Sequence, residues 1–460
     1  MAGKFYPLSA DELRSFVKSA ISLAKGCSRA KVKGILAPHA GYSYSGKAAG
    51  IAYACLENIP FSTAIVIGTG HVKHLEKAAV PVSDIFSTPL GDIEVDNELK
   101  KKFLDSSFFT EDEQAHRLEH SIEVQLPFLQ EIGKEKFKIL PVVLNSINPE
   151  ILRKVGITIG EALKKDGVIL IVSSDLSHYP PGELARLSDR ALLEAYRLAF
   201  AGAGENYFSL AFKLLSDRFP EIDTPACGFS PMSASLTAML SAGFNGFEKI
   251  YYTHSGEISQ DNSAVVGYGC GVFYRGSPTC AIELSESEKK HLLSFARASL
   301  EKKLKGKSFF MFKPSYKFLI PSAVFVTLKK DGKLRGCIGC LEPHILLDEA
   351  VGNYALAAAF EDNRFPPLEA DELGQIGIEI SILSPLKRVS SHVDIIPGIH
   401  GVVIRKGRLC GTYLPQVWEH FDSKEEFLSS LCLEKAGLPA DFWKEKSAEI
   451  YVYSAEHFEE

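Results

Sequence analysis

The chain has 460 residues, of which 46% are hydrophobic and 23% charged, a balance typical of folded globular proteins and unlike that of disordered ones. At this length we expect about two or three domains. The formal net charge is −6, which excludes a global basic field that would attract nucleic acid or acidic membranes. We therefore expect small-molecule or protein partners, and neither nucleic-acid nor membrane binding.

The N-terminal segment lacks the basic start, apolar stretch and cleavage site of a signal peptide, and no apolar run is long enough to span a membrane. The chain has 9 cysteines, an odd number, so we expect reduced thiols rather than a disulfide framework. These features predict a cytoplasmic protein.

The first 276 residues alternate between helix-like and strand-like patterns. Ser9 and Glu12 have the spacing of a capping box, which predicts a helix from there to about residue 25. Further helices are expected at about 46–56, 121–132, 150–163, 184–200, 207–215 and 232–242. Strands are expected at 32–36, 63–67, 137–144 and 168–172, followed by two closing strands. This alternation predicts an α/β fold, a largely parallel sheet sandwiched by helices.

A Gly-Ser-Pro sequence at residues 276–278 interrupts the pattern, and we place the domain boundary there, with domains at 1–276 and 282–460. A second capping-box spacing, Ser285 and Glu288, predicts a helix to about residue 303. Asp331-Gly332 and Lys406-Gly407 each separate two strand-like runs, which predicts two hairpins. Further helices are expected at about 346–360 and 423–436. The second domain therefore reads as α+β with an antiparallel sheet.

Three histidines follow strand-like runs in the first domain. His39 lies in APHAGY (residues 37–42), His71 in GTGH (68–71) and His178 in SSDLSH (173–178). Loops that leave the carboxyl ends of strands in an open α/β sheet converge on one crevice, so the three imidazoles are expected near a common point. Neutral imidazole is the commonest transition-metal ligand, which makes His39 and His71 candidate metal ligands. The plain alternative is a pair of hydrogen-bonded loop histidines.

Cys227 is the candidate third ligand. It lies in TPACG (residues 224–228), a loop directly before a predicted helix, and a helix N-terminus favours thiolate. A thiolate with two imidazoles suits copper, iron or zinc and excludes magnesium or calcium. The alternative is a buried, unreactive thiol.

Four motifs in order resemble the Memo family over residues 1 to about 275: AGKFYP (2–7), APHAGY (37–42), EHSIEVQLP (119–127) and SSDLSH (173–178). The resemblance implies a fold related to class III extradiol dioxygenases and a metal pocket lined by His39, His71 and Cys227. It also implies His178 as a candidate catalytic acid or base. The related dioxygenases hold Fe(II) with two histidines and a carboxylate. Because a cysteine shifts the redox potential, catechol cleavage is not carried over, and iron or copper is expected ahead of zinc.

The second histidine motif departs from the family's usual Gly-Pro-Ser/Asn-His, since it reads GTGH here, and a further histidine, His74, follows. Either His71 alone is therefore the second ligand, or His74 replaces or assists His71. Asp175 has an alternative interpretation as the cap of a turn, with His178 merely packed nearby. One more set of residues fits either a capped, salt-bridged helix start or catalysis: Glu119, His120 and Glu123.

Three motifs of the second half resemble the AMMECR domain over about 282–460: LRGCIG (334–339), AAAFEDNRFPPL (357–368) and GTYLPQV (411–417). The combination resembles proteins A and B of the AmmeMemoRadiSam system fused in one chain, where a radical SAM protein is the third member. This chain has no Cys-x3-Cys-x2-Cys run to hold an iron–sulfur cluster. The resemblance therefore implies a separate radical SAM protein as a partner.

Cys337 is the candidate catalytic nucleophile of the second domain. Arg335 is expected to lower the pKa of this thiol, and His400 is the candidate base; the alternative is a core-packing cysteine. Cys337 and Cys340 form a Cys-x-x-Cys, but no second pair completes a zinc site. The candidate substrate-binding residues, which suit an acidic ligand, are Arg335, Asn363, Arg364 and His400.

The sequence thus predicts a mononuclear-metal redox protein, an oxidoreductase or dioxygenase-like enzyme acting on an unidentified small molecule. Its AMMECR-like domain would bind the substrate or a partner. Two alternatives remain open. The first is a non-catalytic binding or scaffold protein that has kept a dioxygenase-like fold without its chemistry, and the second is a thiol-dependent activity centred on Cys337.

Overall fold

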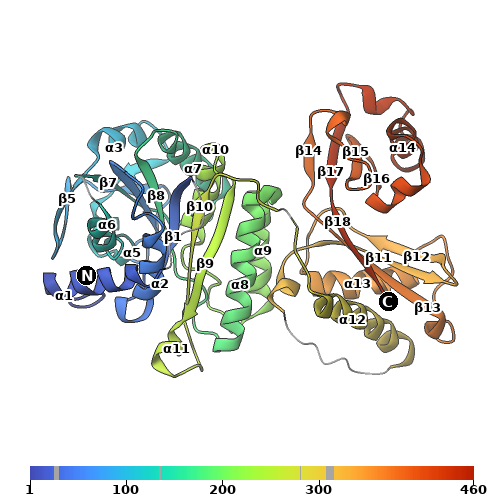
Figure 1. Ribbon diagram of the computed structural model, residues 1–460, viewed down its shortest axis with the longest axis horizontal. Helices are drawn as coiled ribbons and strands as arrows, with labels where there is room; N and C mark the ends of the chain where they lie inside the picture. The colour runs from blue at the N-terminus through green and yellow to red at the C-terminus, as the bar shows by residue number, and fades with distance from the viewer. Residues whose placement is uncertain (25–30, 134–135, 280, 307–314) are drawn as a thin grey trace. The chain divides into compact units, whose positions relative to one another are not determined.

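The computed structural model describes residues 1–24, 31–133, 136–279, 281–306 and 315–460, in two units that comprise residues 1–279 and 280–460 (Figure 1). Within these described ranges, no helix is both long and apolar enough to cross a membrane. Each unit has its own sheets and helices.

A ten-stranded sheet forms the centre of the first unit. Eight of its strands follow the order β4-β5-β7-β2-β8-β1-β10-β9, and β3 pairs with both β7 and β6. The four neighbouring pairs from β5 to β1 are parallel, whereas β4, β10 and β9 pair antiparallel. The predicted parallel sheet is therefore confirmed at its centre, and its edges are antiparallel. The strands are β1 (Val32–Ala37), β2 (Thr63–Gly68), β3 (Ala78–Val80), β4 (Ile85–Thr88), β5 (Gly91–Val95), β6 (Phe109–Glu111), β7 (Lys138–Val143), β8 (Val168–Ser173), β9 (Gly246–His254) and β10 (Gly267–Tyr274).

Helices cover both faces of this sheet. The central strands β2 and β8 are buried at every position, as expected for continuous apolar runs in a parallel sheet. On one face α1, α2 and α6 pack together, and on the other α7, α8, α9 and α10 do so (Figure 1). The helices are α1 (Ala10–Ser22), α2 (Tyr42–Ala54), α3 (Asn97–Leu104), α4 (Glu113–Arg117), α5 (His120–Glu123), α6 (Leu126–Ile132), α7 (Pro149–Leu163), α8 (Gly182–Leu198), α9 (Glu205–Arg218), α10 (Phe229–Ser241) and α11 (Ser255–Ser259).

Several element boundaries differ from the sequence prediction. The first helix ends at Ser22, and residue 25, where it was expected to end, lies outside the described residues. The single helix expected at 121–132 is two short helices, α5 and α6. The strands β3 to β6 were not predicted, because they are three to five residues long and β4 is largely exposed, which leaves too little periodicity to detect.

The second unit contains two four-stranded antiparallel sheets, ordered β12-β11-β13-β18 and β14-β17-β15-β16. Both predicted hairpins are confirmed, and Asp331 and Gly332 adopt φ angles of +52° and +73° in the first turn. The predicted capping box of Ser285 and Glu288 is also present at α12. The elements are α12 (Glu286–Lys305), β11 (Ala323–Lys330), β12 (Lys333–Gly339), α13 (Leu347–Phe360), β13 (Ile376–Leu383), β14 (Lys387–Val389), β15 (Gly401–Lys406), β16 (Leu409–Tyr413), α14 (Lys424–Ser430), β17 (Glu449–Tyr453) and β18 (Ala455–Glu459).

Candidate metal centre

The carboxyl ends of three adjacent parallel strands, β2, β8 and β1, carry the first group of site residues. His39 follows the end of β1 and His71 follows the end of β2, while Ser173 is the last residue of β8. The rings of His39 and His71 meet edge to face, with centroids 5.2 Å apart. The strand order therefore accounts for the meeting of two histidines that are far apart in sequence.

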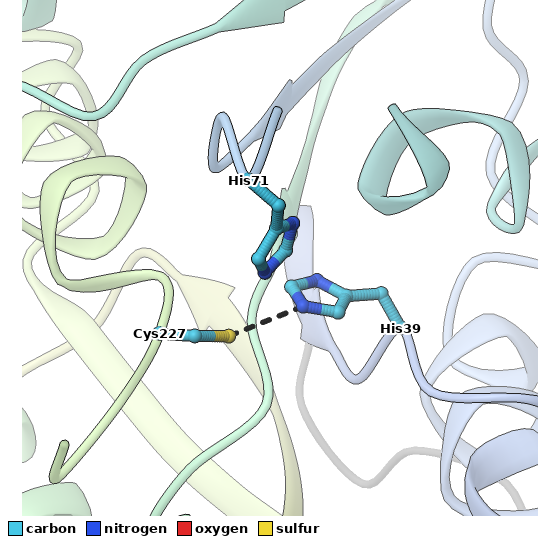
Figure 2. Close-up of side chains that lie close together, drawn as sticks. All are labelled: His39, His71 and Cys227. Atoms are coloured by element: carbon cyan, nitrogen blue, oxygen red, sulfur yellow. Dashed lines mark hydrogen bonds between the residues drawn. The ribbon is translucent and has the colours of Figure 1, made fainter. Parts of the chain in front are cut away.

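Cys227 reaches the same point from the loop that precedes α10. Its Sγ lies 3.1 Å from His39 Nε2, and the side chains of His39, His71 and Cys227 point toward one another (Figure 2). One ligand atom from each of the three residues lies within 4.8 Å of the other two. Bonds from a transition metal to imidazole nitrogen and thiolate sulfur are about 2.0–2.3 Å long, so donors that share one ion lie roughly 3–4.5 Å apart. The donor set therefore fits a single transition-metal ion.

Burial sets the protonation of this cluster. It raises the pKa of the Cys227 thiol well above its usual range, and Asp175 raises it further. The lowered pKa expected at the start of α10 is therefore not found, because burial and then Asp175 raise it instead. Burial, followed by the neighbouring His71, lowers the pKa of His39 well below its usual range. A neutral imidazole thus faces a protonated thiol, and binding of a metal ion would require loss of the thiol proton.

Glu119 holds His71 at two points. The Glu119 carboxylate accepts hydrogen bonds from the backbone N of His71 at 2.6 Å and from its Nδ1 at 2.9 Å. Burial alone would raise the pKa of Glu119, but hydrogen bonds from His71 and Ser121 outweigh it and lower the pKa to about 2. An ionised carboxylate on Nδ1 leaves the Nε2 lone pair of His71 free for the cluster. Glu119 also accepts from Ser121 N at 2.9 Å, so it caps α5 as well.

Two further histidines lie against the cluster. The His120 ring stacks on the ring of His71 at 4.5 Å, and Phe5 stacks on the other side of His120 at 4.5 Å. Burial and the neighbouring His71 lower the pKa of His120 to about 4. They also lower the pKa of His178, whose Nε2 is buried and has no hydrogen-bond partner among the described residues. His74 is exposed and lies outside the group of converging ligand atoms, so the structure brings His71 to the cluster and leaves His74 apart.

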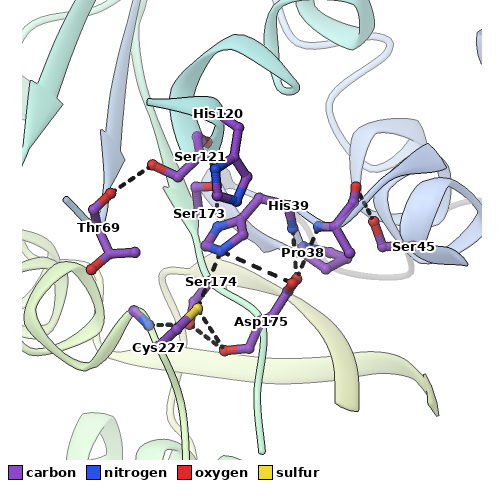
Figure 3. Close-up of polar contacts among 12 residues, drawn as sticks. Pro38, His39, Ser45, Thr69, His120, Ser121, Ser173, Ser174, Asp175 and Cys227 are labelled. Carbon is purple, nitrogen blue, oxygen red and sulfur yellow. Dashed lines mark hydrogen bonds and ion pairs between the residues drawn. The ribbon is translucent and has the colours of Figure 1, made fainter. Parts of the chain in front are cut away.

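Asp175 connects the loops that follow β8 and β1. Its Oδ1 accepts hydrogen bonds from the backbone N of His39 at 2.7 Å and of Ala40 at 3.3 Å (Figure 3). It therefore fixes the backbone at His39, which the interpretation as a turn cap did not anticipate. Gly228 lies against the same loop, and a Cβ there would come within 2.3 Å of Ser174 Oγ. Only glycine allows the Cys227 loop to approach this closely.

Cys337, the candidate nucleophile of the second unit, lies on β12 next to Thr327 of β11. Thr327 Oγ1 donates to Cys337 Sγ at 3.2 Å, and burial raises the pKa of the thiol. The expectation that Arg335 lowers this pKa is wrong, because the Arg335 guanidinium instead pairs with Glu372 at 2.9 Å. The geometry therefore favours a protonated thiol at Cys337.

The remaining candidates of the second unit are spread over its surface. Arg364 pairs with Asp362 at 2.7 Å, and Asp362 accepts a hydrogen bond from Cys337 N at 2.8 Å. Asn363 is exposed. The His400 ring accepts from Ile396 N at 3.1 Å, and within the described residues no hydrogen bond or ion pair joins it to Cys337. The structure therefore brings Arg364 near Cys337, whereas His400, the predicted base, makes no described contact with it.

One cluster of the second unit was missed by the sequence analysis. Ligand atoms of Glu379, His457 and Glu459 converge across β13 and β18. Lys329 Nζ lies 2.6 Å from Glu379 and 3.1 Å from Glu459, so an ammonium group already pairs with both carboxylates. This cluster is an ion-pair network rather than a vacant metal site.

Comparisons with known proteins agree with the division of the chain. Residues 1–272 match the family model described as Memo-like protein, and residues 293–458 match the one described as AMMECR1. A MEMO1 family protein of Methanosarcina barkeri is 38% identical over 270 residues, which are 58% of this chain and 96% of that protein. One from Aquifex aeolicus is 35% identical over 58% of this chain and 95% of its own length. A crystal structure of an uncharacterized protein from Pyrococcus horikoshii is 32% identical over 39% of this chain and 94% of that chain, with a TM-score of 0.36.

Proposed function

Because the chain belongs to the Memo family through residues 1–272 and carries an AMMECR1 domain at residues 293–458, we propose that its first unit is a mononuclear transition-metal redox protein. The proposed ligands are His39, His71 and Cys227. The observation that carries this proposal is the convergence of their ligand atoms within 4.8 Å. We further propose that the fold is related to that of class III extradiol dioxygenases.

The proposed metal is iron or copper ahead of zinc. Two imidazoles and a thiolate suit all three ions, and iron or copper would supply one-electron redox chemistry. The surrounding residues determine how far the site is exposed to solvent. His39 is 1% exposed, so one side of the cluster excludes water, while Cys227 keeps part of its surface exposed. A site closed on one side and open on the other can admit a substrate.

His178 is the proposed acid or base. It is half-buried, its pKa is lowered by burial and by His71, and its Nε2 makes no hydrogen bond within the described part of the chain. A neutral imidazole can accept a proton from a bound small molecule and later return it, and this role requires that the buried Nε2 of His178 become accessible to that molecule.

For the AMMECR1 domain we propose binding of the substrate or of a protein partner, and a separate radical SAM protein as that partner. Within the described residues His400, the predicted base, makes no hydrogen bond to Cys337, and burial raises the pKa of the Cys337 thiol, which supports a binding role over thiol catalysis. The expected reduced thiols suit a reducing compartment, so the proposed location is the cytoplasm.

Redox titration of the metal-loaded protein tests the proposal. Protein purified without oxygen is loaded with Fe(II) or with copper, and its absorption spectrum is followed as the potential is changed. We expect a reversible one-electron transition with a thiolate-to-metal absorption band, and loss of that band in Cys227→Ser. A metal that binds at these residues but shows no transition in the accessible range would contradict the redox function and favour a structural site.

A further inference from the structure

A chain of buried hydrogen bonds leads from α2 and the loop after α5 to the ring of His39. Tyr53 OH donates to Gln125 Oε1 at 3.0 Å, and Gln125 Nε2 donates to Ser173 Oγ at 2.9 Å. Ser173 Oγ lies 3.0 Å from His39 Nδ1. Tyr53, Gln125 and Ser173 are each fully buried, so no solvent competes for these bonds.

The orientation of the Gln125 amide is fixed by a neighbour that can only accept. Gln125 Nε2 lies 2.9 Å from the carbonyl oxygen of Pro38, as well as 2.9 Å from Ser173 Oγ. A flipped amide would place its oxygen against the Pro38 carbonyl oxygen, with no proton between them. Ser173 Oγ must therefore accept a hydrogen bond from Gln125.

The Ser173 hydroxyl proton is also assigned. Ser173 Oγ lies 2.6 Å from the carbonyl oxygen of Ser121, and two oxygens this close need a proton between them, which only Ser173 can supply. With its single proton given to Ser121, Ser173 Oγ can only accept from His39. His39 Nδ1 therefore carries hydrogen, and its lone pair is on Nε2, the atom that faces Cys227 Sγ at 3.1 Å.

We propose that Ser173 is a positioning residue: it gives its hydroxyl proton to the Ser121 carbonyl and accepts from His39, which holds His39 as the Nδ1–H tautomer, so that Nε2 presents its lone pair to a metal ion. The proposal deepens the metal site and rests on the proposed function. His71 reaches the same tautomer by another route, because its Nδ1 donates to the Glu119 carboxylate. Two different acceptors, a neutral hydroxyl and a carboxylate, thus orient two ligands of one site.

The direct test is nitrogen NMR of the metal-free full-length protein labelled with ¹⁵N-histidine, with the His39 signals assigned by their loss in His39→Gln. We expect a protonated Nδ1 and an unprotonated Nε2 in the wild type. In Ser173→Ala we expect a mixture of tautomers, whereas in Gln125→Met the bond from Ser173 to the Ser121 carbonyl remains and the wild-type pattern should persist. Tyr53→Phe is the matched control within the network, because Gln125 keeps Pro38 and Ser173 as partners and the wild-type pattern should persist. Ser235→Ala removes another fully buried serine hydroxyl of the same unit and should change nothing.

The second readout is affinity for Co²⁺, measured by competition with a chelator. We expect Ser173→Ala to weaken binding about 10–100-fold, and Tyr53→Phe and Ser235→Ala to change it by less than about 3-fold. A wild type with hydrogen on Nε2, or a tautomer that survives Ser173→Ala, overturns the inference whether or not the metal binds. A changed tautomer with unchanged affinity overturns its link to the metal. Wild-type protein that has the expected tautomer but binds no metal supports the tautomer assignment and refutes only the proposed function.

Discussion

At the scale of single residues, the cluster depends on groups that do not themselves converge on the proposed metal position. The Glu119 carboxylate and the Ser173 hydroxyl each occupy the Nδ1 side of one histidine. A carboxylate partner makes an imidazole a more electron-rich ligand than a hydroxyl does. We therefore expect the two histidines to be unequal ligands, with His71 the stronger donor.

Glu119→Gln tests the importance of this carboxylate. An amide lacks the negative charge and offers only one acceptor atom, so it cannot serve His71 N, His71 Nδ1 and Ser121 N together. We expect affinity for Co²⁺, measured by chelator competition, to fall about 10–100-fold. Glu123→Gln on the same short helix is the control, since Glu123 binds Tyr6 and the N-terminus instead. Equal affinities of the two variants would show that Glu119 only caps α5.

The histidines and the cysteine were predictable from sequence, but the residues that orient them were not. A histidine directly after an apolar run is a local signal, and the sheet then determines where it lies. The contact of Ser173 with His39 spans 134 positions and that of Gln125 with Ser173 spans 48, and no local pattern encodes them. The pKa of Cys227 was predicted in the wrong direction for the same reason, since burial is a property of the folded chain.

At the scale of elements, the alternating apolar runs predicted β1, β2 and β8, the three strands that carry the cluster. The strands β3 to β6 and the split of the helix at 121–132 were missed because these pieces are short. That split places Gln125 between α5 and α6, where its side chain can reach Ser173. The element prediction was therefore reliable where strands are long and buried, and failed where the chain changes direction often.

The hairpin turn of β11 and β12 allows a matched test of backbone conformation. Gly332 has φ +73° whereas Gly374 has no positive φ, and a Cβ at either position would meet no atom within 4 Å. Gly332→Ala should lower the free energy of unfolding of the second unit by about 1–2 kcal/mol, because L-residues are strained at positive φ. Gly374→Ala should change it by less than about 0.5 kcal/mol. Urea unfolding followed by tryptophan fluorescence is the measurement, since both tryptophans, Trp418 and Trp443, lie in this unit. Equal decreases in the free energy of unfolding of the two variants would refute the expected turn geometry.

The ion pair of Arg335 and Glu372 predicts a dependence of stability on pH. Hydrogen bonds from Arg335 and then Lys330 lower the pKa of Glu372 from 4.5 to about 2. Because the pKa is lower in the folded state, the carboxylate stabilises the unit fully above about pH 4.5, and this contribution is lost as the pH falls toward 2. Glu372→Gln should therefore cost about 1–2 kcal/mol at neutral pH and progressively less below pH 4. The same fluorescence assay, repeated across pH, measures this cost. If the wild type and Glu372→Gln still differ in free energy of unfolding at low pH, the lowered pKa of Glu372 is contradicted.

At the scale of the whole molecule, two units with separate cores carry two separate groups of candidate residues. All three proposed metal ligands, and every group found to orient them, lie within residues 1–279. Residues 1–279 expressed alone should therefore fold and bind Co²⁺ within about 3-fold of the full chain, as measured by circular dichroism and chelator competition. A folded but metal-free fragment would mean that the second unit completes the site.

The most direct test of the central claim is the metal content of protein purified without oxygen, for the wild type and for His39→Ala, His71→Ala and Cys227→Ser, with folding checked by circular dichroism. We predict near-stoichiometric iron or copper in the wild type and its loss in all three folded variants. A well-folded wild type without metal, or variants that retain it, would contradict the assignment of His39, His71 and Cys227 as a metal centre.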